Sequence, residues 1–196
     1  MTTTADRSAK FISGLSSPFL IGMLGLVLLI TLRPETTGKA LYWLFLYVGL
    51  TLVIPLLYIG FQVLRGHLTD IHVMVREQRR GPFIVGLTSV VVLFGTLFLL
   101  QAPTILLVMT VATLLNGTTL LIGNRFTKIS VHAAALASTT TALGILISPW
   151  FFLGYLGLPP IMWARLKRGR HTSSQFLLGT IEGALVTFAA YKIFGF

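Results

Sequence analysis

Residues 82–122 read PFIVGLTSVVVLFGTLFLLQAPTILLVMTVATLLNGTTLLI, and this stretch decides the fold class because it contains no charged side chain. Pro103 divides it into two apolar segments of about 20 residues each, which is the length of an α-helix that crosses a bilayer. Proline is tolerated in the first turn of a helix, so Pro82 and Pro103 mark where two helices begin. A chain that crosses lipid must satisfy its own backbone hydrogen bonds, so the stretch predicts two transmembrane helices.

The rest of the chain has the same apolar character. Of its 196 residues, 55% are hydrophobic and 10% are charged, and the mean hydropathy is +0.88. A soluble domain of this size needs more polar surface. We therefore predict an all-α, polytopic transmembrane helical bundle that forms a single domain, residues 1–196. Pro159 and Pro160 disturb the sixth apolar segment, so six crossings are an alternative to seven. The seven expected crossings are residues 14–32, 41–64, 82–101, 103–122, 131–148, 149–163 and 172–194.

Composition also excludes several kinds of chemistry. The chain has no cysteine, so it has no disulfides, thiolate nucleophiles or cysteine metal sites. Its five carboxylates form no paired Asp-rich motif, which argues against enzymes that hold magnesium, and we expect neither a metal nor another cofactor. The net charge of +10 is explained better by anionic membrane lipids, phosphate ligands and membrane topology than by nucleic acid. An oligomeric state is not indicated.

Polar residues concentrate in three clusters between the apolar segments, at 65–82, 124–132 and 164–171. An even number of predicted crossings separates each cluster from the next, so all three should lie on one face of the membrane, together with the N-terminus. This holds only if the sixth segment crosses. The only cations expected on the opposite face are Arg33, Lys39 and Lys192. The positive-inside rule therefore places the clusters in the cytoplasm, as in a bacterial-type inner membrane.

The clusters contain residues suited to phosphate chemistry. His132 and His171 each lie at the predicted start of a helix, where unpaired backbone N–H groups favour anions. Arginine offers forked donors that match phosphate oxygens, and Lys128 adds a point charge. Histidine can act as a nucleophile or as a general acid near neutral pH. Together these residues indicate phosphoryl transfer at a membrane surface.

The spacing of these residues resembles the signature of the type-2 phosphatidic acid phosphatase superfamily, which consists of integral-membrane lipid phosphatases. The third motif of the family, Ser-Arg-x5-His-x3-Asp, is similar to residues 164–175, where Arg165, His171 and Gln175 keep the spacing. The second motif, Pro-Ser-Gly-His, is similar to residues 129–132. The first motif, Lys-x6-Arg-Pro, is matched loosely by residues 72–80. The resemblance covers residues 65–185 as a phosphatase-like core and leaves the N-terminal helices, residues 1–64, without a motif.

The resemblance implies a reaction and a role for each residue. His171 would be the nucleophile that forms a phosphohistidine, His132 would protonate the leaving oxygen, and Gln175 would orient His171. The implied substrate is a lipid phosphomonoester or diphosphate, such as phosphatidate or a prenyl (di)phosphate. The residues expected to bind the phosphate are Arg79, Arg165, Ser130, Arg76, Lys128 and His72.

Two other functions stay open. Gln175 occupies a position where the family has an acid, and it supplies no charge. A catalytically silent protein of the same fold that binds anionic lipid is therefore the alternative. A small transporter is a third hypothesis, but it would need polar residues through the midplane, and apart from Asn116 and Glu182 these are few. A carboxylate such as Glu182 is costly within an apolar helix unless it is paired or hydrated.

Overall fold

A computed structural model of the chain describes residues 3–71, 73, 75 and 77–196. The helical share is 81%, and the described residues contain no strand, which confirms the all-α prediction. Pro18, Pro34 and Pro149 each stand at or next to the first residue of a helix, where a missing N–H group costs nothing.

Four helices in the described part of the chain are long and apolar enough to cross a membrane. The first, Ala40–Leu64, joins α4 (Ala40–Val48), the π-helix η1 (Gly49–Val53) and α5 (Ile54–Leu64). The second, Glu77–Leu99, joins the 3-10 helix η2 (Glu77–Arg79) and α6 (Arg80–Leu99). The others are α7 (Thr104–Gly123) and α10 (Ser173–Ile193). These helices are compatible with an integral membrane protein.

The expectation of seven crossings is not confirmed, because the remaining helices are short or broken. The helices α1 (Thr4–Leu15) and α2 (Pro18–Leu32) meet at a bend of 44° and make a fifth span only if they are counted together. α3 (Pro34–Thr37) is a single turn, and α8 (Val131–Leu146) has 16 residues. Residues 149–167 form a 3-10 helix, η3 (Pro149–Gly157), followed by α9 (Leu158–Lys167).

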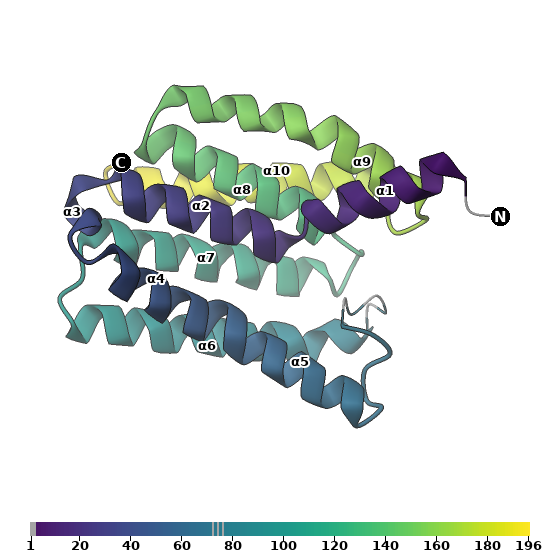
Figure 1. Cartoon of the computed structure of the whole chain (residues 1–196), viewed down its shortest axis with the longest axis horizontal. Coiled ribbons are helices and arrows are strands. Elements are labelled where there is room, and N and C mark those ends of the chain that lie inside the picture. The colour runs from purple at the N-terminus through teal and green to yellow at the C-terminus, as the bar shows by residue number, and fades with distance from the viewer. Residues whose placement is uncertain (1–2, 72, 74, 76) are drawn as a thin grey trace.

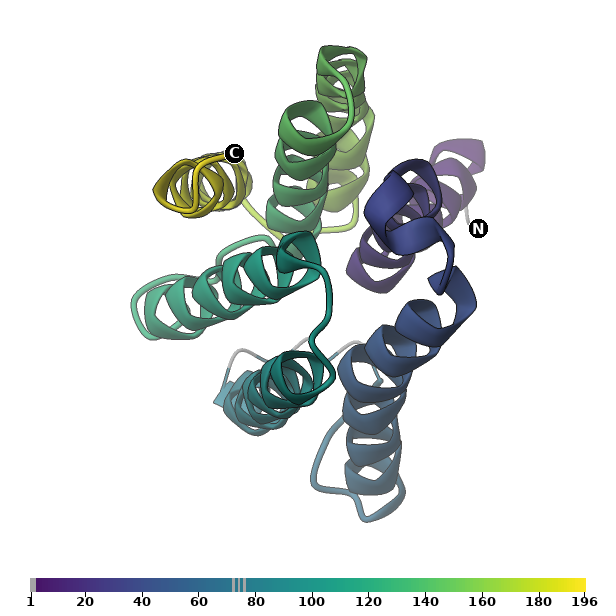
Figure 2. The ribbon, with the colours of Figure 1, turned by 90° about the vertical axis from the view of Figure 1, so that its left-hand side faces the viewer.

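The helices run back and forth along the long axis of the molecule, so the loops gather at its two ends (Figure 1). The described parts of the three polar clusters and the N-terminus lie at one end, on the right of Figure 1. The C-terminus and the loop after α2 lie at the other end. Figure 2, which looks along the bundle, shows α10 beside both α7 and α8. We call the end that holds the three clusters the polar end.

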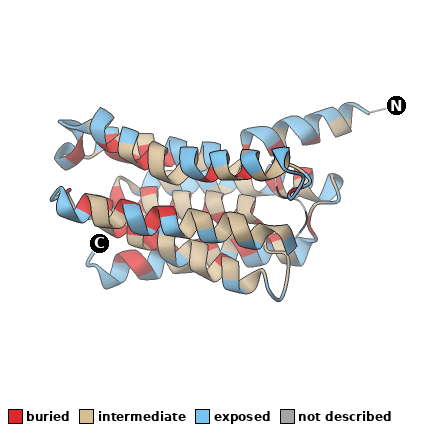
Figure 3. Ribbon diagram, turned by 90° about the horizontal axis from the view of Figure 1, so that it is seen from below, coloured by how far each residue is buried: buried red, intermediate tan, exposed pale blue. Residues whose placement is uncertain are grey.

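The interior and the exterior of the bundle are both apolar. Leu29, Leu93 and Leu106 are buried in one cluster between the helices. Leu41 and Leu99, in contrast, are 83% and 82% exposed on the outside. Figure 3 shows buried residues on the inner sides of the helices and exposed residues outside. Large exposed apolar side chains over a whole bundle are expected where the surrounding solvent is lipid.

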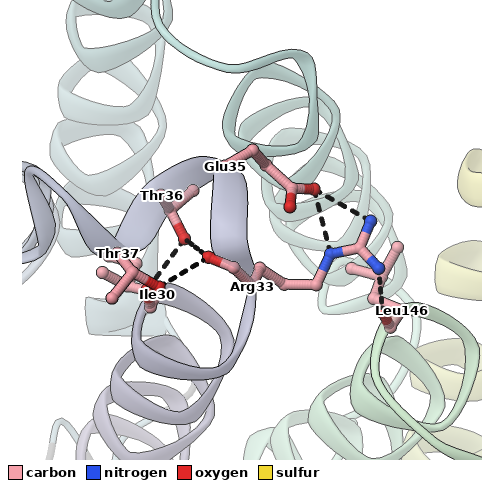
Figure 4. A network of polar contacts seen from close by, with 6 residues as sticks. All are labelled: Ile30, Arg33, Glu35, Thr36, Thr37 and Leu146. Atoms are coloured by element: carbon pink, nitrogen blue, oxygen red, sulfur yellow. Dashed lines mark hydrogen bonds and ion pairs between the residues drawn. The ribbon is translucent and has the colours of Figure 1, made fainter.

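At the end opposite the polar end, Arg33 ties α2 to α8 (Figure 4). Its Nε and Nη2 atoms lie 3.0 and 2.9 Å from Oε1 of Glu35, and its Nη1 donates to the Leu146 carbonyl at 2.9 Å. Thr36 Oγ1 donates to the carbonyls of Ile30 and Arg33, at 2.8 Å in each case. The last carbonyls of a helix lack intrahelical partners, and a cation stabilises them. Arg33 is therefore an arginine whose charge and donors are compensated.

Two glycines let α10 pack directly on α8. A Cβ atom on Gly179 would lie 2.4 Å from the Ser130 carbonyl oxygen, and one on Gly183 would lie 2.3 Å from that of Ala134. Small residues one turn apart commonly allow helices in lipid to approach each other. The Ser130 N–H also donates to the Gln175 carbonyl at 3.1 Å. The first turns of α8 and α10 are thus held together at the polar end.

We expect Gly183→Ala to destabilise the protein by about 1–3 kcal/mol, because the new methyl group pushes against the α8 backbone, which cannot move aside as a flexible side chain would. The thermal unfolding midpoint in detergent should fall by several degrees. Gly95→Ala in α6 is the matched control, since a Cβ atom there would meet nothing within 4 Å. Equal unfolding midpoints for the two variants would contradict the close approach of α8 and α10.

Candidate functional site

Residues from all three polar clusters meet at the polar end. Arg79 is the last residue of η2, Lys128 lies in the loop between α7 and α8, and Arg165 lies in the last turn of α9. His171 follows in the loop before α10. The charges of Arg165, Arg79 and Lys128 all act on the His171 imidazole, so the four side chains are near one another. We call these four residues the cationic site.

His171 is held as a neutral imidazole with one nitrogen available. Its side chain is buried, and its Nδ1 lies 3.1 Å from the Lys128 carbonyl oxygen. A carbonyl only accepts, so Nδ1 carries the hydrogen and Nε2 keeps its lone pair. Burial, and then the charges of Arg165 and Arg79, lower the pKa of His171 to about 4. His171 is therefore uncharged at neutral pH.

The two arginines of the cationic site have donors without partners. Arg165 Nη1 donates to Ser13 Oγ in α1 at 2.7 Å, but its buried Nε has no acceptor among the described residues. Arg79 Nε donates to the Val73 carbonyl at 3.1 Å, and its buried Nη1 likewise lacks an acceptor in the described part of the chain. Asp70 offsets part of the Arg79 charge. A buried donor without a partner costs free energy, so both arginines are prepared for an acceptor.

The site concentrates positive charge. The charges of Arg168, Arg170 and Arg79 all act on Arg165. Burial lowers the pKa of Lys128, with a further contribution from the charges of Arg79, Arg170 and Arg165. Like charges that depress one another's pKa values are stabilised by an anion placed between them. Arg33 at the opposite end shows the contrast, because Glu35 pairs with it.

Ser130 and His132 lie at the start of α8, beside the cationic site in sequence and in space. Ser130 is fully buried and caps α8, with its Oγ accepting from the Ala133 N–H at 3.5 Å. Its own N–H is bonded to the Gln175 carbonyl, so that N–H is not directed at a ligand. His132 is partly buried in the first turn of α8, and it too has an interaction partner in the structure.

Gln175 makes contacts other than the one expected of it. Its side-chain Oε1 accepts from the backbone N–H of Thr172 at 3.2 Å, and its backbone N–H donates to Thr172 Oγ1 at 3.3 Å. Together these two bonds form a capping box for α10. The hydrogen bond that was expected from His171 to Gln175 goes instead to the Lys128 carbonyl. The Lys128 carbonyl group therefore accepts the hydrogen bond from His171 Nδ1, the role that the resemblance assigns to residue 175.

Two predicted phosphate ligands, His72 and Arg76, lie outside the described residues. Two groups were not anticipated, namely the Lys128 carbonyl and the Ser13 hydroxyl. Ser13 lies in the N-terminal part, for which the sequence shows no motif, and it is buried on the side of α1 that packs against α9. A backbone carbonyl leaves no signal in residue type, and a serine in an apolar helix leaves a weak one.

Within the described residues, no three histidine or carboxylate side chains gather closely enough to hold a metal ion. Comparison with known proteins adds no assignment, because the sequence matches no family model, no characterised protein and no solved structure at a significant level.

Proposed function

We propose that this protein is a membrane phosphatase that hydrolyses a lipid phosphomonoester or diphosphate through a phosphohistidine on His171. The observation that carries the proposal is the state of His171. Its Nδ1 is tied to a backbone carbonyl, its charge is suppressed, and its Nε2 is left as a nucleophile among cations with unused donors. An anion-binding site alone has no need of a neutral imidazole at its centre.

The reaction follows from these groups. His171 Nε2 forms a bond to phosphorus while the bond from phosphorus to the lipid oxygen breaks. The leaving oxygen keeps the electron pair and takes a proton from His132. Arg79 and Arg165 donate to the phosphoryl oxygens as charge develops on them. A water molecule then attacks phosphorus, loses its proton to His132 and releases phosphate, and the electron pair of the P–N bond returns to Nε2.

A lipid substrate is favoured by the place of the cationic site. His171 stands two residues before α10, an apolar helix of membrane-spanning length, and Arg79 stands at the start of another. A phosphate bound there lies at the depth of lipid headgroups, where phosphatidate and prenyl (di)phosphates carry their phosphate. Phosphatidate and prenyl (di)phosphates are equally compatible with the site.

The test is release of phosphate by the purified protein in detergent, without added metal, from a panel of lipid phosphates, with quenching in alkaline sodium dodecyl sulfate to trap phosphohistidine, which is stable to base and labile in acid. Release together with a labelled His171 peptide supports the proposal. Binding of lipid phosphate with neither release nor phosphohistidine would replace it with the silent anionic-lipid-binding protein.

We expect the low pKa of His171 to appear in the pH dependence of the reaction. The nucleophile must be neutral, so kcat/KM should not fall through protonation of His171 until the pH approaches about 4. Arg165→Gln removes the charge that lowers the pKa of His171 most. This change should move the acid limb toward the ordinary histidine pKa of about 6.5. Both proteins should be measured with one substrate, so that ionisation of the substrate cancels. Superimposable acid limbs would contradict the electrostatic origin of the neutral imidazole.

We also propose that the chain crosses the membrane seven times, with the cationic site on the cytoplasmic side of a bacterial-type inner membrane. A 3-10 helix rises about 2.0 Å per residue, so η3 covers about 18 Å, and α9 adds about 15 Å. The two together match the hydrocarbon thickness of about 30 Å. α8 reaches about 24 Å and, with Ser130 and Ile147 flanking it, crosses a slightly thinned bilayer.

This topology predicts that single cysteines at Gln78, Thr127 and Gly169 react with an impermeant thiol reagent from the same side of the membrane, the cytoplasmic side. The wild-type chain contains no cysteine, so each variant carries a single reactive thiol. Cysteine at Lys39, in the loop after α2, is the matched control and should react from the other side. Labelling of Thr127→Cys and Gly169→Cys from opposite sides would show that residues 149–167 do not cross together with α8.

A further inference from the structure

The inner faces of α7 and α10 share a polar cluster that phosphate chemistry does not use. It consists of Asn116 and Thr119 on α7 and Glu182 and Thr187 on α10. Glu182 lies near the middle of α10, about 14 Å along the helix from Ser173. Both helices are candidate membrane spans, so the carboxyl group lies deep in the apolar region. A charged carboxylate is costly at that depth unless it is paired or hydrated, which makes Glu182 a candidate functional residue.

Charge compensation for Glu182 is missing in the part of the chain that the structure describes. Thr119 is the only described side chain that bonds to it, through Oε1. α7 contains no titratable residue, and α8 contains only His132, in its first turn. The other titratable residues of α10 are Tyr191 and Lys192, near its far end. A deprotonated carboxylate at this position would have no partner charge among the described residues.

Thr119 has one hydroxyl hydrogen and three acceptors around it. These are Glu182 Oε1, the Leu115 carbonyl at 3.0 Å and the Asn116 carbonyl at 2.9 Å. Thr113 and Thr118 of the same helix donate to the carbonyl four residues earlier, at 2.9 and 2.7 Å. If Thr119 bonds within its own helix in the same way, the Thr119–Glu182 contact needs a hydrogen on Glu182.

Two further acceptors have no donor. The Asn116 amide nitrogen donates to the Ala112 carbonyl at 2.8 Å and to Thr187 Oγ1 at 3.0 Å, which fixes the amide orientation and leaves Oδ1 as the free atom. Asn116 Oδ1 and Glu182 Oε2 are both buried without a partner among the described residues. Asn116 and Thr119 are three residues apart and share the side of α7 that faces α10. The cluster therefore has an excess of oxygen acceptors and lacks a positive charge.

We propose that Asn116, Thr119 and Glu182 form an intramembrane binding site for one monovalent cation, a proton on Glu182 or a sodium ion in its place. Both ligands supply the same missing feature, a positive charge shared by oxygen atoms. This site lies between α7 and α10, whereas the cationic site lies at the polar end. Exchange of the bound cation at this depth is the property that a transport or sensing function would need.

The test uses dicyclohexylcarbodiimide, an apolar reagent that adds to protonated carboxyl groups within lipid. The carboxyl proton moves to a carbodiimide nitrogen, the carboxyl oxygen bonds to the central carbon, and the adduct rearranges to an N-acylurea without losing an atom. We expect peptide mass spectrometry of protein in lipid vesicles to find the adduct on Glu182, with about a tenfold or larger decrease between pH 6 and pH 9. Glu35 is the matched control and should stay unlabelled because its carboxylate forms an ion pair with Arg33.

Sodium chloride and choline chloride, compared at equal concentration, separate the two ligands. Protection by sodium alone identifies a site that exchanges sodium, and equal labelling in both salts identifies a proton site. Glu182→Gln should remove the adduct while leaving phosphate release unchanged, so this proposal and the phosphatase proposal can fail independently. Absence of the Glu182 adduct at every pH in folded protein, when the unfolded chain is labelled, would overturn the cation site. Labelling that depends on neither pH nor sodium would also overturn it.

Discussion

Replacing His171 by alanine is expected to abolish release of phosphate from lipid phosphates, with turnover lowered by at least about 10⁴-fold. The loss is expected because no other described group at the cationic site combines a free nucleophilic nitrogen with a fixed hydrogen bond on its far side. Binding of the lipid phosphate should persist, since Arg79 and Arg165 keep their donors. The measurement is phosphate release, together with the equilibrium binding of a lipid phosphate to the same preparation.

His67→Ala is the matched control, because His67 is exposed in the loop between α5 and α6. It should leave turnover within about twofold of wild type.

His132→Ala should slow the hydrolysis of a monoester by about 10²–10⁴-fold, as loss of a general acid does. It should slow the hydrolysis of a diphosphate less, because the leaving group of a diphosphate needs less protonation. A phosphohistidine trapped in the His171→Ala protein would place the nucleophile elsewhere.

The helical class of this fold could be predicted from the sequence, and the number of crossings could not. Residues 82–122 give two helices separated at Pro103, as expected from their apolar length. The expected sixth crossing, residues 149–163, is short for an α-helix that crosses lipid and is interrupted by Pro159 and Pro160. Their 3-10 geometry lengthens the segment, and a rise per residue has no signal in hydropathy. The glycines at 179 and 183, in contrast, form a spacing typical of close helix contacts in lipid.

The site could be predicted in part. Motif spacing placed Arg165 and His171 in one site, and the shared polar face added Lys128; these three side chains are near one another in the structure. Spacing did not reveal which group holds the imidazole, because the acceptor is the backbone carbonyl of Lys128 and every residue type has a backbone carbonyl. Gln175 lies one turn after His171, but a Thr-x-x-Gln sequence is also typical of a helix cap, and the structure uses it as one.

The contacts of the polar-end arginines favour the proposed anion site over a topology signal alone. Cations that serve only to orient the chain are solvated and have no reason to be buried. Arg79 and Arg165 each have one guanidinium nitrogen bonded within the protein and another that is buried without an acceptor among the described residues. This arrangement orients the guanidinium groups before a ligand arrives, which reduces the entropy lost on binding. Arg168, three residues after Arg165, makes no side-chain hydrogen bond to another described residue and fits the topological role.

Arg165→Gln is therefore expected to lower kcat/KM by about 10²–10³-fold, because it removes a charged donor from the developing phosphoryl charge. Arg168→Gln removes the same charge from the same helix end and should change kcat/KM by less than about threefold.

Ser13→Ala keeps the Arg165 charge but removes the hydroxyl group that accepts from Arg165 Nη1 at 2.7 Å. It should therefore lower kcat/KM by about tenfold with little change in KM. Ser8→Ala, at an exposed position of the same helix, is its control. Equal losses for Arg165→Gln and Arg168→Gln would mean that net charge alone attracts the substrate, and full activity of Ser13→Ala would show that the N-terminal helix takes no part in placing Arg165.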